Sequence, residues 1–127
     1  PAIADIDVVN ALRASARELG IEPILGLVRS HDAFYLESPG AHEGWEERIR
    51  PWTDAGVKVV ENESATLFVV ASLLGGLRAG TILLTGKNLY DGHGAMSTSN
   101  SEHYAEKVEL MTQITLRAFG KLAGLEG

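Results

Sequence analysis

The 127-residue chain contains no cysteine, which excludes a disulfide framework and thiolate chemistry. It also lacks an excess of positive charge. Seventeen acidic and 11 basic residues give a net charge of −6, which disfavours a nucleic-acid or anionic-membrane surface. No apolar run approaches the roughly 20 residues of a membrane span, and we expect no signal peptide. The sequence therefore predicts a cytoplasmic protein without a membrane or nucleic-acid partner.

The composition that remains is that of a globular domain. Apolar residues make up 45% of the chain and charged residues 22%, a balance typical of folded rather than disordered proteins. The length matches one domain, so we expect residues 1–127 to form a single domain. Because the first residue is proline and not methionine, we also expect the natural chain to begin upstream.

The hydrophobic pattern predicts alternating helices and strands. Helices are expected at residues 5–19, 44–55, 63–76 and from 99 onward, and strands at 24–28, 57–60 and 79–86. The strands are continuous apolar runs, as in parallel sheets covered on both faces. The fold class is therefore α/β, with a mostly parallel sheet flanked by helices. Three strands make a thin sheet, so we expect further strands outside this segment.

Capping and burial signals refine the helices. Asp5 or Asp7 can cap the first helix and Gly20 can end it, while Pro51 should disturb the helix at 44–55. Residues 63–76 are apolar on nearly all sides, which predicts a buried helix. The buried stripe of the last helix is predicted to be Tyr104, Val108, Met111, Thr115 and Leu122.

Polar side chains follow each predicted strand. The groups are Ser30, His31 and Asp32 with Phe34 close behind, then Glu61, Asn62 and Glu63, and finally Gly86, Lys87 and Asn88. Ligands of open α/β sheets bind outside the carboxyl ends of the strands. Paired carboxylates accept hydrogen bonds from sugar hydroxyls, and an aromatic ring beside them suits a planar base.

Several common catalytic motifs are absent. The chain has no phosphate-binding P-loop, no dinucleotide-binding glycine fingerprint and no serine nucleophile elbow. The sequence DGHG at 91–94 resembles a metal loop only loosely. The four histidines show no ligand spacing, and we expect no metal site.

Three motifs together resemble a known family. They are DAFY at 32–35, ENESATL at 61–67 and GLRAG at 76–80. Their order and spacing are similar to those of the nucleoside phosphorylase family, in its uridine phosphorylase-like branch, and the resemblance covers nearly the whole chain. It implies a larger α/β nucleoside phosphorylase domain of which this chain is the C-terminal half.

The resemblance also implies a reaction. Such enzymes cleave the N-glycosidic bond of a nucleoside with phosphate as co-substrate, giving a free base and ribose 1-phosphate without a metal or cofactor. The transition state is oxocarbenium-like, so the enzyme must hold the ribose and stabilise the departing base. The family also implies a homo-oligomer.

Four residues take roles from the resemblance. Glu63 matches the glutamate that binds the ribose hydroxyls, and Glu61 matches the first glutamate of the motif. Asn62 stands where the family usually has methionine, and its amide can hydrogen-bond a hydroxyl. Phe34 matches the aromatic residue that stacks on the base.

Other family elements are not matched. Residues 36–44 lack the glutamine and arginine that recognise uracil, so the base is left open. Asp91 is the nearest candidate for the acid that protonates a purine. The family's phosphate site comes from its N-terminal half, so the chain alone is expected to be inactive, with that half as its partner.

Each residue also has a structural interpretation. Glu63 can be a helix N-terminal acid, Glu61 a solvated loop carboxylate, Asn62 a turn residue and Phe34 a core anchor. The alternative functions are a nucleosidase that uses water, or an inactive nucleoside-binding or assembly module.

Overall fold

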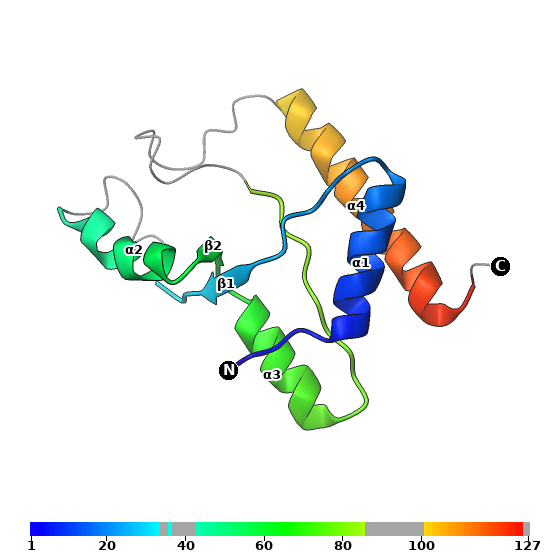
Figure 1. Cartoon of the computed structure of the whole chain (residues 1–127), viewed down its shortest axis with the longest axis horizontal. Helices are drawn as coiled ribbons and strands as arrows, with labels where there is room; N and C mark the ends of the chain where they lie inside the picture. The colour runs from blue at the N-terminus through cyan, green and yellow to red at the C-terminus, as the bar shows by residue number, and fades with distance from the viewer. Residues whose placement is uncertain (34–35, 37–42, 86–100, 126–127) are drawn as a thin grey trace. The chain divides into compact units, whose positions relative to one another are not determined.

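The structure is a computed structural model that describes residues 1–33, 36, 43–85 and 101–125 (Figure 1). Phe34 and Asp91 lie outside the described residues, as does residue 99, where the last helix was predicted to begin. The elements are α1 (Ile6–Glu18), β1 (Leu27–Ser30), α2 (Trp45–Asp54), β2 (Val57–Glu61), α3 (Ser64–Leu74) and α4 (Ser101–Ala123). This alternation confirms the predicted α/β class.

The contacts divide the chain into two compact units. Unit 1 comprises Pro1–Ile24, Thr66–Leu84 and Asn100–Gly127, and unit 2 comprises Leu25–Ala65 and Thr85–Ser99. Helix α3 begins in unit 2 and continues in unit 1. That residues 1–127 form a single domain stays a prediction.

Unit 2 contains a parallel pair of strands. Leu27 of β1 pairs with Val57 of β2, and Ser30 pairs with Glu61, with a register shift directly after Leu27. The valines of β2 favour a strand because β-branched side chains fit a pleated surface. The predicted bounds of the first strand, 24–28, were wrong. An apolar run indicates burial, whereas backbone pairing decides where a strand begins and ends.

Helix α2 of unit 2 begins after Gly44, whose φ of 81° lies in the left-handed region. Pro51 lies inside the helix, which nevertheless continues to Asp54. Ile49 is buried, and α2 contacts β2. The helix predicted at 44–55 is therefore confirmed.

Unit 1 is built on α1 and α4, which lie side by side (Figure 1). Their buried residues are mostly small, and they are Ala11, Ser15 and Ala16 of α1 with Ile114 and Ala118 of α4. Small side chains allow two helices to approach closely. The buried stripe predicted for α4 was wrong, because Tyr104 is 63% exposed and the other four predicted residues, Val108, Met111, Thr115 and Leu122, are only partly buried.

The ends of α1 follow the sequence signals. Asp5, rather than Asp7, caps the helix, because its carboxylate accepts hydrogen bonds from the amides of Asp7 and Val8 at 3.0 and 3.1 Å. Gly20 has a φ of 76°, which suits the residue after a helix end. None of the described helices is both long and apolar enough to cross a membrane.

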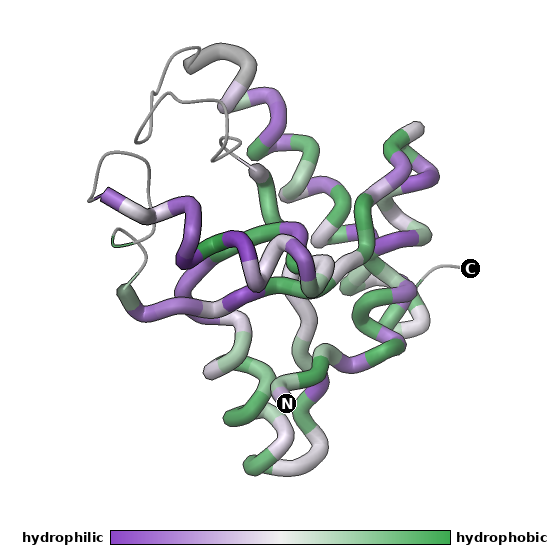
Figure 2. The backbone as a smooth tube through the Cα atoms, turned by 60° about the vertical axis from the view of Figure 1, so that its left-hand side comes forward, coloured by the Kyte–Doolittle hydropathy of each residue, from purple (hydrophilic) through white to green (hydrophobic). Residues whose placement is uncertain are grey.

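Helix α3 is apolar but exposed, so its predicted burial was wrong. Figure 2 shows the predominantly hydrophobic character of α3. Leu73 is 80% exposed and Leu74 67%, while Ser64 and Ala71 are buried. A helix without a polar face predicts burial only where other layers cover it, and the described residues do not cover these side chains.

The strand predicted at 79–86 does not form in the described residues 79–85. The Ala79 carbonyl instead accepts a hydrogen bond from the Asp5 amide at 2.8 Å. Gly80 lies directly against Val8 of α1. A strand requires a paired neighbour, and the described part of the chain supplies none to this segment.

Candidate functional site

The carboxyl ends of β1 and β2 lie at the same edge of the sheet. Ser30 and Glu61 are register partners, and the His31 amide extends the pairing by donating to the Glu61 carbonyl at 2.7 Å. Two of the three predicted polar groups therefore meet at one edge. The third, residues 86–88, lies outside the described residues.

Glu61 organises the start of α3. One carboxylate oxygen, Oε2, accepts hydrogen bonds from the amides of Glu63 and Ser64 at 2.8 and 2.7 Å. The first amides of a helix have no partner within the helix, so an acceptor here stabilises the helix start. The interpretation of Glu61 as a solvated loop carboxylate was wrong, because the residue ends β2 and is partly buried.

Ser30 completes this arrangement from the neighbouring strand. Its hydroxyl donates a hydrogen bond to Oε1 of Glu61 and accepts one from the Ala65 amide at 2.8 Å. Sequence reasoning placed Ser30 at the edge without giving it a role. The available signal was a serine at the end of one predicted strand, matched with a glutamate at the end of the next.

The surroundings of Glu61 lower its pKa. Burial alone would raise the pKa of this carboxyl, but hydrogen bonds from Ser30 and from the amides of Ser64 and Glu63 favour the ionised form and outweigh it. Glu61 is therefore negatively charged at neutral pH. A negative charge also suits the N-terminal end of a helix.

Asn62 and Glu63 are exposed at the same edge. Helix α3 begins at Ser64, so Glu63 precedes the first turn. Its amide is bonded to Glu61, whereas within the described residues no hydrogen bond or ion pair involves its carboxylate. The backbone of Glu63 is held while its side chain is open to a ligand.

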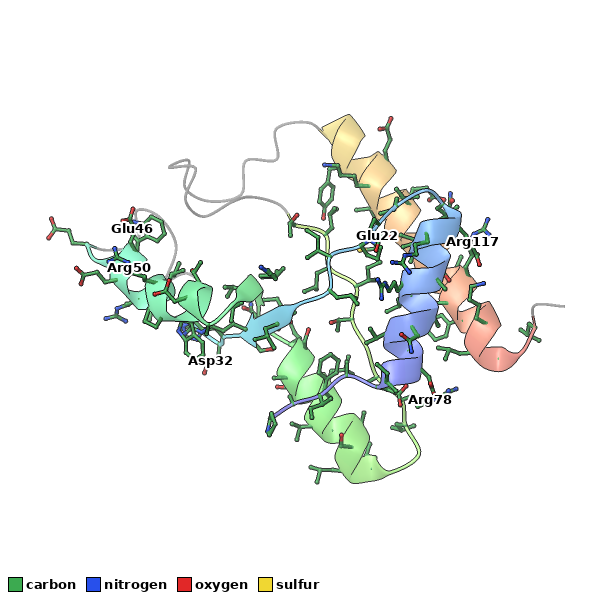
Figure 3. The ribbon with its side chains drawn as sticks, in the orientation of Figure 1. Glu22, Asp32, Glu46, Arg50, Arg78 and Arg117 are labelled. Carbon is green, nitrogen blue, oxygen red and sulfur yellow. The ribbon has the colours of Figure 1, made fainter. Side chains whose placement is uncertain are left out.

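The predicted base side is only partly described. Asp32, labelled in Figure 3, is exposed just beyond β1, and its Oδ1 lies 3.4 Å from Nδ1 of His31. The Arg29 guanidinium lies 4.3 Å from the centre of the Trp52 ring and so links β1 to α2. Phe34 lies outside the described residues, so its proposed contact with a base stays a prediction.

Several described arginines lie close to carboxylates, among them Arg78 and Arg117, which are labelled in Figure 3. Arg78 lies 3.9 Å from Asp7, and Arg117 lies 3.7 Å from Glu18. Arg17 pairs with Glu22 at 2.7 Å. No group of three or more metal-binding side chains occurs in the parts of the chain that the structure describes.

The α/β fold and the exposed carboxylate at the joint between β2 and α3 fit the resemblance found in the sequence. The sequence profile of the Phosphorylase superfamily matches residues 1–120. The chain belongs to this superfamily, as a relative of the nucleoside phosphorylases.

The relatives that the chain matches are named after different nucleosides. The chain is 35% identical to a guanosine phosphorylase of Halorubrum lacusprofundi, over 93% of this chain and 47% of the relative. It is 36% identical to a uridine phosphorylase of Haemophilus influenzae, over 65% of this chain and 35% of the relative. It is 29% identical to a purine nucleoside phosphorylase of Plasmodium falciparum, over 97% of this chain and 47% of the relative. The chain spans less than half the length of these relatives.

Proposed function

We propose that the protein is a nucleoside phosphorylase in which this chain supplies the ribose- and base-binding side. The reaction is phosphorolysis of an N-glycosidic bond, which gives a free base and ribose 1-phosphate. The observation that carries the proposal is the position of Glu63 at the carboxyl edge of the sheet. Its carboxylate is exposed, while its backbone amide is held by a hydrogen bond to Glu61. The matched relatives support the reaction class.

The chemistry of the edge suits a ribose. An ionised Glu63 accepts hydrogen bonds from ribose hydroxyls, and charge-assisted bonds of this kind are the stronger ones. A nearby negative charge also favours the positive charge that develops on the sugar in an oxocarbenium-like transition state. Asn62 adds an amide to the same edge, and we assign Phe34 to stacking on the base.

The phosphate site is proposed to come from the part of the domain that the relatives have outside the matched region. Arg17, Arg78 and Arg117 are each placed against a carboxylate, which makes them poor candidates for binding phosphate. We therefore propose that the chain needs a further segment for activity. The complete enzyme is proposed to be a homo-oligomer that takes nucleoside and phosphate as its substrates.

Phosphorolysis by the full-length natural protein tests this function. Guanosine, inosine, adenosine, uridine and thymidine are each incubated with and without phosphate, and the free base is measured. Phosphate-dependent release from at least one nucleoside is expected. Equal release without phosphate would indicate a nucleosidase, and binding without release would indicate an inactive module.

A further inference from the structure

One hydroxyl group connects the ends of both strands with the start of α3. Ser30 ends β1, donates to the carboxylate of Glu61 at the end of β2, and accepts from the Ala65 amide in the first turn of α3. Glu61 in turn binds the amides of Glu63 and Ser64. We call this set of four hydrogen bonds the Ser30–Glu61 clamp.

The clamp lies beneath the open part of the site. Ser30 and Glu61 are partly buried and Ser64 is 2% exposed, whereas Asn62 and Glu63 are exposed. The backbone is held in place on both sides of Asn62 and Glu63. The backbone of Glu61 is fixed by pairing with β1, and the amides of residues 63–65 are fixed by the clamp.

We infer that Ser30 is a positioning residue of the ribose site, which acts through Glu61 and the first turn of α3 to orient the Glu63 carboxylate. This inference rests on the proposed function. Ser30 itself touches no substrate.

Accurate orientation is what the ribose contact requires. A binding side chain must be held within about 0.5 Å of its productive position by a supporting shell, and small displacements are costly in rate. Removal of the Ser30 hydroxyl takes away the acceptor of the Ala65 amide and one of the donors to the Glu61 carboxylate. The start of α3 is then free to shift, and Glu63 shifts with it.

The first test is kinetic and uses the full-length protein. We expect Ser30→Ala to raise the KM for the nucleoside about 10-fold, which corresponds to about 1.4 kcal/mol, while the KM for phosphate stays unchanged. Ser30→Thr retains a hydroxyl and should restore the KM to within about 2-fold of the wild-type value.

The matched control is Ser72→Ala. Ser72 lies on α3, and its hydroxyl donates a hydrogen bond to the Phe68 carbonyl in the preceding turn at 2.8 Å, its one hydrogen bond among the described residues. This variant removes a helix hydroxyl without touching the clamp, so its nucleoside KM should match the wild type. A Ser30→Ala variant that loses thermal stability but keeps its nucleoside KM would overturn the positioning role.

The second test needs no activity. Amide hydrogen exchange of the full-length protein should be faster at Ala65 in Ser30→Ala than in the wild type, and unchanged in Ser72→Ala. If the wild type is inactive and Ser30→Ala speeds exchange at Ala65, the proposed function is contradicted and the clamp is supported. An active wild type in which Ser30→Ala leaves exchange at residues 63–65 unchanged supports the function and overturns the clamp.

Discussion

The Ser30 hydroxyl donates a hydrogen bond to the Glu61 carboxylate, and this bond joins the ends of two parallel strands. Because the other oxygen of Glu61 holds the amides that begin α3, the carboxylate is committed to structure. The carboxylate of Glu63 has no such commitment in the described part of the chain. We therefore propose that, of the two glutamates of the ENESATL motif, Glu61 supports the start of α3 and Glu63 binds the ligand.

Loss of the Glu63 charge should weaken ribose binding. A hydrogen bond to a charged group contributes about 1.5–3 kcal/mol, so Glu63→Gln should lower kcat/KM for the nucleoside by roughly 10- to 150-fold. The free energy of unfolding should change little, because the side chain is exposed. Steady-state kinetics and urea unfolding of the full-length protein measure the two effects.

Glu46→Gln is the control for this substitution. Glu46 is an exposed acid in the first turn of α2, so it matches Glu63 in its position near a helix start (Figure 3). Its replacement should leave kcat/KM near the wild-type value. Equal losses in both variants would show that overall charge, and not the position of Glu63, controls activity.

The low pKa of Glu61 makes part of the stability dependent on pH. The unfolded chain binds a proton at this residue at a higher pH than the folded chain does. The resulting stabilisation is fully present above the unfolded-state pKa and is lost as the pH falls through the lower folded-state pKa. Urea unfolding should show Glu61→Gln less stable than the wild type at pH 7, with the difference shrinking in acid. A constant difference at every pH would contradict this role.

Gly80→Ala should destabilise unit 1. An added Cβ would lie 2.6 Å from Cγ1 of Val8, a short and stiff side chain. Overpacking of this kind costs about 1–3 kcal/mol. In the double variant with Val8→Ala the loss measured by urea unfolding should be smaller than the sum of the single losses.

Gly26→Ala is the matched comparison for Gly80→Ala. The added Cβ would lie 2.4 Å from Cγ of Lys58, which can rotate toward solvent because the residue is exposed, and 3.2 Å from its Cβ. We expect a loss smaller than that of Gly80→Ala, because rotation of the Lys58 side chain relieves the shorter contact. A larger loss from Gly26→Ala than from Gly80→Ala would show that the contact between Val8 and Gly80 is not tight.

Ser15→Ala should stabilise the protein. Ser15 is fully buried among the small residues of α1 and α4, and its hydroxyl has no hydrogen-bond partner in the described structure. An unpaired buried polar group costs about 1–3 kcal/mol. The urea midpoint should rise more for Ser15→Ala than for Ser72→Ala, since both share the gain in helix propensity. An equal or lower midpoint would mean that the Ser15 hydroxyl is paired in solution.

The features predictable from sequence are those decided by neighbouring residues. The Asp5 cap, the turn at Gly20 and the passage from β2 into α3 depend on signals within a few positions of each other. The exposure of Leu73 was not predictable, because burial depends on what covers the helix. The extent of β1 depended on pairing with β2, which the apolar run at residues 24–28 did not reveal.

The position of the candidate site was predictable from the sequence, whereas the roles of its residues were less so. Parallel strands bring Ser30 and Glu61 to one edge, which the order of elements implied. A carboxylate at a strand end can bind a ligand or cap the next helix, and its residue type does not distinguish the two. The choice for Glu61 follows from a hydroxyl on the other strand and from amide positions known only in three dimensions.

A crystal structure of the full-length protein with ribose 1-phosphate tests the central claim most directly. We predict that the Glu63 carboxylate lies within hydrogen-bond distance of the ribose hydroxyls, while Glu61 keeps its bonds to Ser30 and to the amides of residues 63 and 64. A ribose bound away from this edge, or held by Glu61 after its release from Ser30, would contradict the account.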